Sequence, residues 1–140
     1  MDSARILIAI KNDTLAGKLR GILVGNGYMK YKLRMTEDEV FERAVAMVKY
    51  SKKLCEDVEF SAEDASRTRP EFLYKVVEAV IKAGATVVNI PDTVGYAAPL
   101  EFGRLIKEIR EKVNGVEKID LSVHCHGRYD VRYRILAAGI

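Results

Sequence analysis

The sequence predicts an α/β fold in which parallel strands alternate with helices. Three apolar, strand-like segments begin near residues 58, 86 and 119, and a helix-like segment separates each of them from the next. Strand and helix units that repeat at about thirty residues are typical of a (β/α) barrel or a doubly wound sheet. The 140 residues are 49% hydrophobic and 31% charged, which is a composition typical of soluble globular domains.

The first elements precede this repeat. We expect a strand over residues 5–10 and a helix over residues 14–24, although neither is strongly patterned. A clearer helix follows, because Thr36 and Glu39 have the spacing of a capping box. This helix should extend to about Leu54, with apolar residues at helical spacing: Val40, Phe41, Ala44, Val45 and Val48.

The second unit begins with an alternating strand over residues 57–64. Thr68 and Glu71 predict a second capping box, and Pro70 falls in the first turn, where proline is tolerated. Gly84 is a natural helix stop. The apolar stripe of this helix consists of Phe72, Leu73, Val76, Val77, Val80 and Ile81.

The third unit has a short apolar strand over residues 86–90, which Pro91 is expected to end. A helix begins near Pro99 and ends before the turn at Asn114 and Gly115. A last strand from Ile119 then leads into two histidines. The apolar positions of the third helix are Phe102, Leu105, Ile106, Ile109 and Val113.

Charge and cysteine content restrict the class of protein. Residues 1–35 hold seven Lys/Arg against two Asp, residues 36–126 are acidic, and residues 127–140 are again basic. The basic flanks could bind polyanions, but they lack a stacking array of aromatic residues and any recognisable nucleic-acid motif, so we do not expect nucleic acid as a partner. We expect no membrane span, because no apolar run is long enough. Two cysteines give no disulfide framework, which favours a cytoplasmic location.

Polar residues follow each predicted strand at its carboxyl end, where parallel α/β folds bind ligands. His124 and His126 lie two residues apart on a strand, so their imidazoles share a face and could hold one metal ion. They could also be ordinary hydrogen-bonded strand residues, and the other polar residues could serve as helix caps. The candidates are Ser61, Glu63, Asp64, Arg67, Asp92, Thr93, His124 and His126.

Four segments, in the same order and spacing, closely resemble the 2-isopropylmalate synthase family and, less closely, homocitrate and citramalate synthases. They are residues 29–36, 58–68, 89–96 and 122–126, with sequences MKYKLRMT, VEFSAEDASRT, NIPDTVGY and SVHCH. The resemblance implies a partial (β/α)8 TIM barrel of three to four βα units over residues 29–126. It leaves an unassigned basic segment at 1–28, which could form a strand and a helix, and a divergent tail at 127–140.

The resemblance also implies a reaction. These synthases join acetyl-CoA to a 2-oxoacid, which is 2-oxoisovalerate in leucine biosynthesis, with a divalent metal (Mg, Mn or Zn) as Lewis acid. By resemblance, His124 and His126 are metal ligands, Glu63 contacts the oxoacid or helps proton transfer, and Thr93 binds the substrate carboxylate. Ser61, Arg67 and Asp92 are further candidates for substrate binding, although Arg67 and Asp92 could instead hold the loops in shape.

The sequence departs from the family at both ends of the resemblance. Gly127 to Asp130 follow the second histidine where the family has Asn-Asp-Leu-Gly, and no Arg-Asp-Gly motif with a metal-binding aspartate precedes Met29. A full barrel takes about 250 residues, so we expect a fragment that is inactive alone. It would form a homo-oligomer or pair with the missing half-barrel. The alternative is a non-catalytic half-barrel that acts as a structural or binding module.

Overall fold

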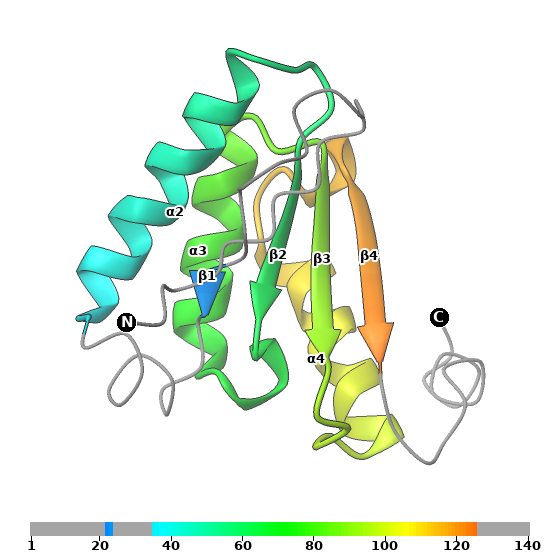
Figure 1. The fold of residues 1–140 in the computed structure, drawn as a ribbon. Helices are drawn as coiled ribbons and strands as arrows, with labels where there is room; N and C mark the ends of the chain where they lie inside the picture. Colours follow the sequence, from blue (N-terminus) through cyan, green and yellow to red (C-terminus); the bar gives the residue numbers. More distant parts are fainter. Residues whose placement is uncertain (1–21, 24–34, 126–140) are drawn as a thin grey trace.

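The chain forms a parallel sheet with its strands in the order β1, β2, β3, β4, as seen in a computed structural model (Figure 1). The structure describes residues 22–23 and 35–125. The strands are β1 (Ile22–Leu23), β2 (Glu59–Glu63), β3 (Val87–Asp92) and β4 (Asp120–Cys125). All described pairs are parallel, which confirms the predicted α/β class.

Three α-helices connect and cover the strands: α2 (Glu37–Lys52), α3 (Pro70–Ala83) and α4 (Pro99–Lys112). Helix α2 begins at the predicted capping box, in which the Glu39 amide donates to Thr36 Oγ1 and the Thr36 amide donates to Glu39 Oε2. Two short 3₁₀ turns, η2 (Ala65–Arg67) and η3 (Val116–Lys118), lie in the connections. Among the described residues, no helix is both long and apolar enough to cross a membrane.

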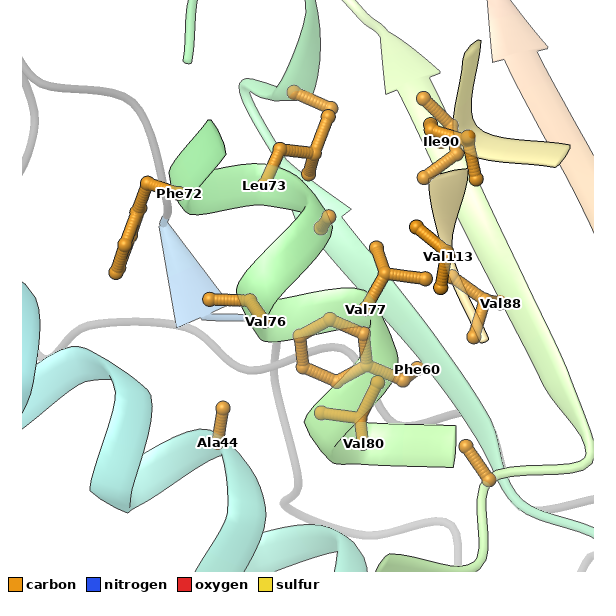
Figure 2. Packing of buried hydrophobic residues seen from close by; sticks show 14 of the residues in the cluster. Ala44, Phe60, Phe72, Leu73, Val76, Val77, Val80, Val88, Ile90 and Val113 are labelled. Atoms are coloured by element: carbon orange, nitrogen blue, oxygen red, sulfur yellow. The ribbon is translucent and has the colours of Figure 1, made fainter. Parts of the chain in front are cut away.

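The core lies between the sheet and the helices. Phe60 in β2 and Val88 and Ile90 in β3 are fully buried, and they meet the apolar stripe of α3 in one layer (Figure 2). The stripe was predicted almost completely, because residues at helical spacing face one direction. Phe72, Leu73, Val76, Val77 and Val80 are buried, and Ile81 packs at the edge of the core.

Alternation along the strands assigns the other sheet face to polar residues. Since successive side chains point to opposite faces, Glu59, Ser61 and Glu63 lie on the face away from Phe60 and Ala62. The register extends this face across the sheet, because Ser61 is the partner of Asn89, and Asn89 is the partner of Ser122. The helix-covered face therefore holds the core, and the opposite face carries polar groups.

Three expectations about local structure were wrong. The second capping box does not form: Arg69 is the N-cap residue without a side-chain bond, and Thr68 Oγ1 instead donates to the Asp64 carbonyl oxygen. Pro91 lies inside β3 rather than beyond its end. Proline is tolerated there because pairing with β2 ends at Asn89, which leaves one side of the strand without a ladder.

The third error concerns the beginning of the chain. Residues 22 and 23, which we expected in a helix, form β1 and pair with Ala62 and Glu63 of β2. Parallel pairing with a strand far along the chain overrides the weak local helical pattern. The rest of that helix, the strand expected over residues 5–10 and the tail at 127–140 lie outside the described residues.

Candidate functional site

The end of β2 presents two of the predicted residues on the polar face. Ser61 is buried, with 6% of its surface exposed, and Glu63 is half-buried two residues further on. The chain then turns sharply at Asp64, whose φ of 65° is in the left-handed region. Aspartate adopts this conformation more readily than most residues. The turn directs the following residues away from the strand and into η2.

The loop after β2 is held by its own polar side chains. Arg67 Nε donates to Asp64 Oδ1 at 2.6 Å, and Thr68 Oγ1 donates to the Asp64 carbonyl oxygen at 3.0 Å. Asp64 is buried, whereas about a third of the Arg67 side chain is exposed. This ion pair gives both residues a role in shaping the loop, and contact of Arg67 with substrate stays a prediction.

The end of β3 is organised around the carboxylate of Asp92. Asp92 is fully buried, and its Oδ1 accepts hydrogen bonds from Ser66 Oγ at 2.8 Å and from the Tyr96 amide at 2.9 Å. Its Oδ2 accepts from the Ala97 amide at 3.2 Å. Such a carboxylate shapes the loop that begins with Thr93, which is exposed beside it. Contact of Asp92 with substrate likewise stays a prediction.

His124 lies near the end of β4, level with the end of β3. Its register partner is Pro91, and Cys125 is the partner of Asp92. The His124 side chain is exposed at this edge, and its role as a metal ligand stays a prediction. His126 lies outside the described residues. Within residues 22–23 and 35–125, no group of three or more His, Cys, Asp or Glu side chains could hold a metal ion.

Sequence reasoning missed two polar residues at this edge, Asn89 and Ser66. Asn89 is 8% exposed, and its Nδ2 donates to Ser61 Oγ at 3.0 Å. Its Oδ1 is buried and has no hydrogen-bond partner in the described part of the chain. The one signal in the sequence was an amide residue within an otherwise apolar strand. Ser66 gave no signal, because a serine in a loop is typical of a turn.

The clearest electrostatic effects lie in the helix layer. Tyr74 in α3 donates from its hydroxyl to Glu108 Oε2 in α4 at 2.6 Å, and Lys112 donates to the same oxygen at 2.8 Å. Burial and the hydrogen bond to Glu108 raise the pKa of Tyr74. Hydrogen bonds from Lys112 and Tyr74 lower the pKa of Glu108. These groups link two helices rather than form part of the strand-end site.

The carboxyl ends of β2, β3 and β4 thus gather Ser61, Glu63, Asp92, Thr93 and His124 along one edge of a parallel sheet. Comparison with known proteins identifies the family of the chain. The family described as HMGL-like matches residues 21–131, which are most of the chain and include every described candidate. The chain belongs to the HMGL-like family. This membership confirms the barrel as the fold, and the described sheet is an open part of its wall.

Curated relatives of this HMGL-like chain are named 2-isopropylmalate synthase. That of Ruminiclostridium cellulolyticum is 74% identical over 99 residues, which cover 71% of this chain and 20% of the relative. That of Halothermothrix orenii is 60% identical, with 71% of this chain and 19% of the relative covered. That of Dictyoglomus turgidum is 51% identical over 126 residues, with 90% and 25% covered. The predicted resemblance is therefore confirmed.

The HMGL-like chain spans about a fifth to a quarter of the length of these relatives. The longest of the three matches covers 126 residues, and the other two cover 99 residues each. Similarity is therefore high for the part of the barrel that this chain represents. At least three quarters of the length of each relative lies outside the match.

Proposed function

We propose that this chain forms part of the catalytic domain of an acyltransferase of the 2-isopropylmalate synthase type. The reaction condenses acetyl-CoA with a 2-oxoacid, 2-oxoisovalerate, in leucine biosynthesis. The observation that carries the proposal is the row of polar side chains at the carboxyl ends of β2, β3 and β4. It is supported by 74% identity to a protein named for this activity.

Roles for the strand-end residues follow from their placement. Glu63, half-buried at the end of β2, is suited to contact the oxoacid or move a proton during enolate formation. Thr93 is exposed beside the buried Asp92, so its hydroxyl can donate to the substrate carboxylate. Ser61 lies deeper on the same face, hydrogen-bonded to Asn89, and lines the floor of the site.

A divalent ion (Mg, Mn or Zn) fits this edge only in part. His124 and His126 would supply two imidazole ligands, and a stable site needs at least one more from elsewhere, since no described cluster supplies it. When bound, the ion would polarise the keto group of the oxoacid. The described residues would bind and orient the oxoacid beside it, through Thr93 and Glu63.

Asp92 and Arg67 are better suited to hold the loops than to bind substrate. Asp92 already accepts three hydrogen bonds from Ser66, Tyr96 and Ala97, and Arg67 is paired with Asp64. A group that is fixed in this way can position its neighbours, as substrate-positioning shells do. Substitution of either would therefore act mainly through the loops.

A titration of the purified chain tests the metal assignment. Mn²⁺ is added in the presence of 2-oxoisovalerate, and paramagnetic broadening of backbone resonances is followed by NMR. We expect broadening centred on His124 and the neighbouring end of β3, and its loss in His124→Ala. Cys125→Ser is the matched control, because residue 125 points to the other sheet face. Broadening that persists in His124→Ala would contradict the assignment.

A turnover assay tests the reaction. Free CoA thiol is measured with acetyl-CoA, 2-oxoisovalerate and Mg²⁺. We expect no release from the 140-residue chain alone, because its matches cover only 19% to 25% of these curated relatives. Release should begin when a second polypeptide supplies the missing barrel strands, and Glu63→Gln should abolish it. Robust turnover by the chain alone would contradict the proposal that its active site is incomplete. Comparison of the rates with 2-oxoisovalerate, pyruvate and 2-oxoglutarate would identify the preferred oxoacid.

The proposed setting is the cytoplasm, and the proposed assembly is a homo-oligomer or a pair with the other half of a barrel. The proposal of a reducing compartment rests on the low cysteine content, Cys55 and Cys125 being the two cysteines of the chain. The edge of β4 and the two-residue β1 leave the described sheet without a closed barrel. Open sheet edges favour pairing with another chain.

A further inference from the structure

A side-chain hydrogen bond joins the loops that follow β2 and β3. Ser66, in the middle of η2, donates from Oγ to Asp92 Oδ1 at 2.8 Å, and Asp92 is the last residue of β3. The backbone pairing of these strands stops earlier, at Ser61 and Asn89. Glu63 and Asp92 therefore lie beyond the β2–β3 ladder, and the Ser66 bond links the two strand ends where the ladder no longer does.

On the β3 side, the hydrogen bond from Ser66 ends at the Asp92 carboxylate, which also holds the loop that follows β3. The amides of Tyr96 and Ala97 donate to the two oxygens of Asp92, and the Gly95 amide donates to its carbonyl oxygen at 3.1 Å. Gly95 has a φ of 65°, which completes the tight turn. Movement of the Asp92 carboxylate would therefore move the loop that carries Thr93.

On the β2 side, Ser66 lies on an anchored segment. Ala65 beside it is fully buried in the core, and Arg67 on its other side is paired with Asp64 at 2.6 Å. The Thr68 amide also donates to the Ala65 carbonyl oxygen, which closes η2. The Ser66 hydroxyl is thus held at a fixed place relative to the end of β2 and Glu63.

We propose that Ser66 is a positioning residue, which fixes the loop carrying Thr93 relative to the end of β2 carrying Glu63. It acts through Asp92 and touches no substrate itself. The substrate roles of Glu63 and Thr93 rest on the proposed function, but the mechanical link does not. A 2-oxoacid held between the two strand ends requires both ends in place, and misplacement by about 1 Å is costly to such sites.

Amide hydrogen exchange in the full chain, measured by NMR, tests the link directly. In Ser66→Ala we expect exchange at Tyr96 and Ala97 to rise about fivefold, as loss of one hydrogen bond predicts, while exchange at Val88 and Ile90 stays unchanged. Ser66→Thr keeps the hydroxyl and should restore the wild-type rates. The matched control is Ser51→Ala, because the Ser51 hydroxyl is buried but has no hydrogen-bond partner within the described residues.

Two results would overturn the proposal: unchanged exchange at Tyr96 and Ala97 in Ser66→Ala, or a rise of the same size at Val88 and Ile90. If Ser66→Ala does not fold, Ser66→Thr decides, since raised exchange in a folded variant that keeps the hydroxyl contradicts the link. A titration with 2-oxoisovalerate and Mg²⁺ on the same samples separates the two proposals. Lack of binding even when a second polypeptide supplies the other barrel strands would count against the proposed function, while the exchange rates still decide the role of Ser66.

Discussion

At the scale of single residues, Gly84 shows how one backbone conformation fixes the end of a helix. Its φ of 112° ends α3, and a Cβ there would lie 3.0 Å from Lys52 Cγ. We expect Gly84→Ala to lower the free energy of unfolding by about 1 kcal/mol or more, because the strained φ is added to the close contact. Urea denaturation measures this, with Lys82→Ala as the control on the exposed side of the same helix end.

Phe60 shows the cost of losing a core side chain. It is fully buried between β2 and α3 (Figure 2). Phe60→Ala should lower the free energy of unfolding by about 3–5 kcal/mol, since it removes apolar contacts and leaves a cavity. Leu100→Ala is the control, because Leu100 is 64% exposed and its truncation should change stability little. Equal effects of the two substitutions in urea denaturation would show that the core is not packed as described.

At the scale of elements, we expect the contact between α3 and α4 to depend on pH. The pKa of Glu108 is lowered by hydrogen bonds from Lys112 and Tyr74, so its stabilising effect is present above the unfolded pKa near 4.5. The effect is lost as pH falls through the lower, folded pKa. The pKa of Tyr74 is raised, so the contribution of its neutral phenol is present below pH 10 and is lost at more alkaline pH.

This linkage gives a test at the same scale. Glu108→Gln should reduce the free energy of unfolding at pH 7, and this reduction should shrink as the pH falls through the lowered pKa of Glu108 and the wild-type carboxylate gains a proton. Thermal unfolding between pH 3 and pH 7 measures the difference. Glu111→Gln is the matched control. Glu111 is an exposed glutamate of the same helix, and its Oε1 lies 3.8 Å from Lys107 Nζ, farther than Glu108 Oε2 lies from its partners. An identical pH profile for the two variants would contradict the role of Glu108.

The elements also show which local features the sequence could predict. The strong apolar stripes of α3 and α4 and the capping box of α2 were enough to locate the three helices, because each signal depends on neighbours within one or two turns. The capping box predicted at Thr68 does not form, because the Thr68 hydroxyl donates to the Asp64 carbonyl oxygen in the preceding turn. Residues 22–23 form a strand only through pairing with β2, a partner about forty residues away that local pattern reading does not see.

At the scale of the whole molecule, the described sheet is open on the side of β4. A cavity of about 540 Å³ lies between α4 and β4, and its apolar lining includes Phe102, Ile106, Leu121 and Val123. We expect the purified chain to associate at high concentration, because burial of this surface is favourable. Sedimentation velocity should show the larger species diminished in Leu121→Lys and retained in Leu100→Lys. A wild-type chain that is monomeric at every concentration would contradict this.

The candidate site was predictable in part at this scale. The rule that ligands bind at the carboxyl ends of parallel strands selected Glu63, Thr93 and His124 before any coordinates, because it depends only on the order of strands and helices. The bond from Ser66 to Asp92 was not predictable, because it depends on where two loops meet in space. Asn89 required the register of β2 against β3, which no single strand specifies.

The alternation of side chains across the sheet separates two kinds of sequence constraint. Ser61, Asn89 and Ser122 form one row across three strands, and their chain neighbours Phe60, Val88 and Leu121 face the helices instead. A change of volume or polarity in the row can therefore alter the surface offered to a ligand while the packing against α3 and α4 is preserved. Residues that folding requires therefore alternate along each strand with residues that can change with the ligand. Substitutions at every second position can change what this part of the barrel wall binds while its core stays the same.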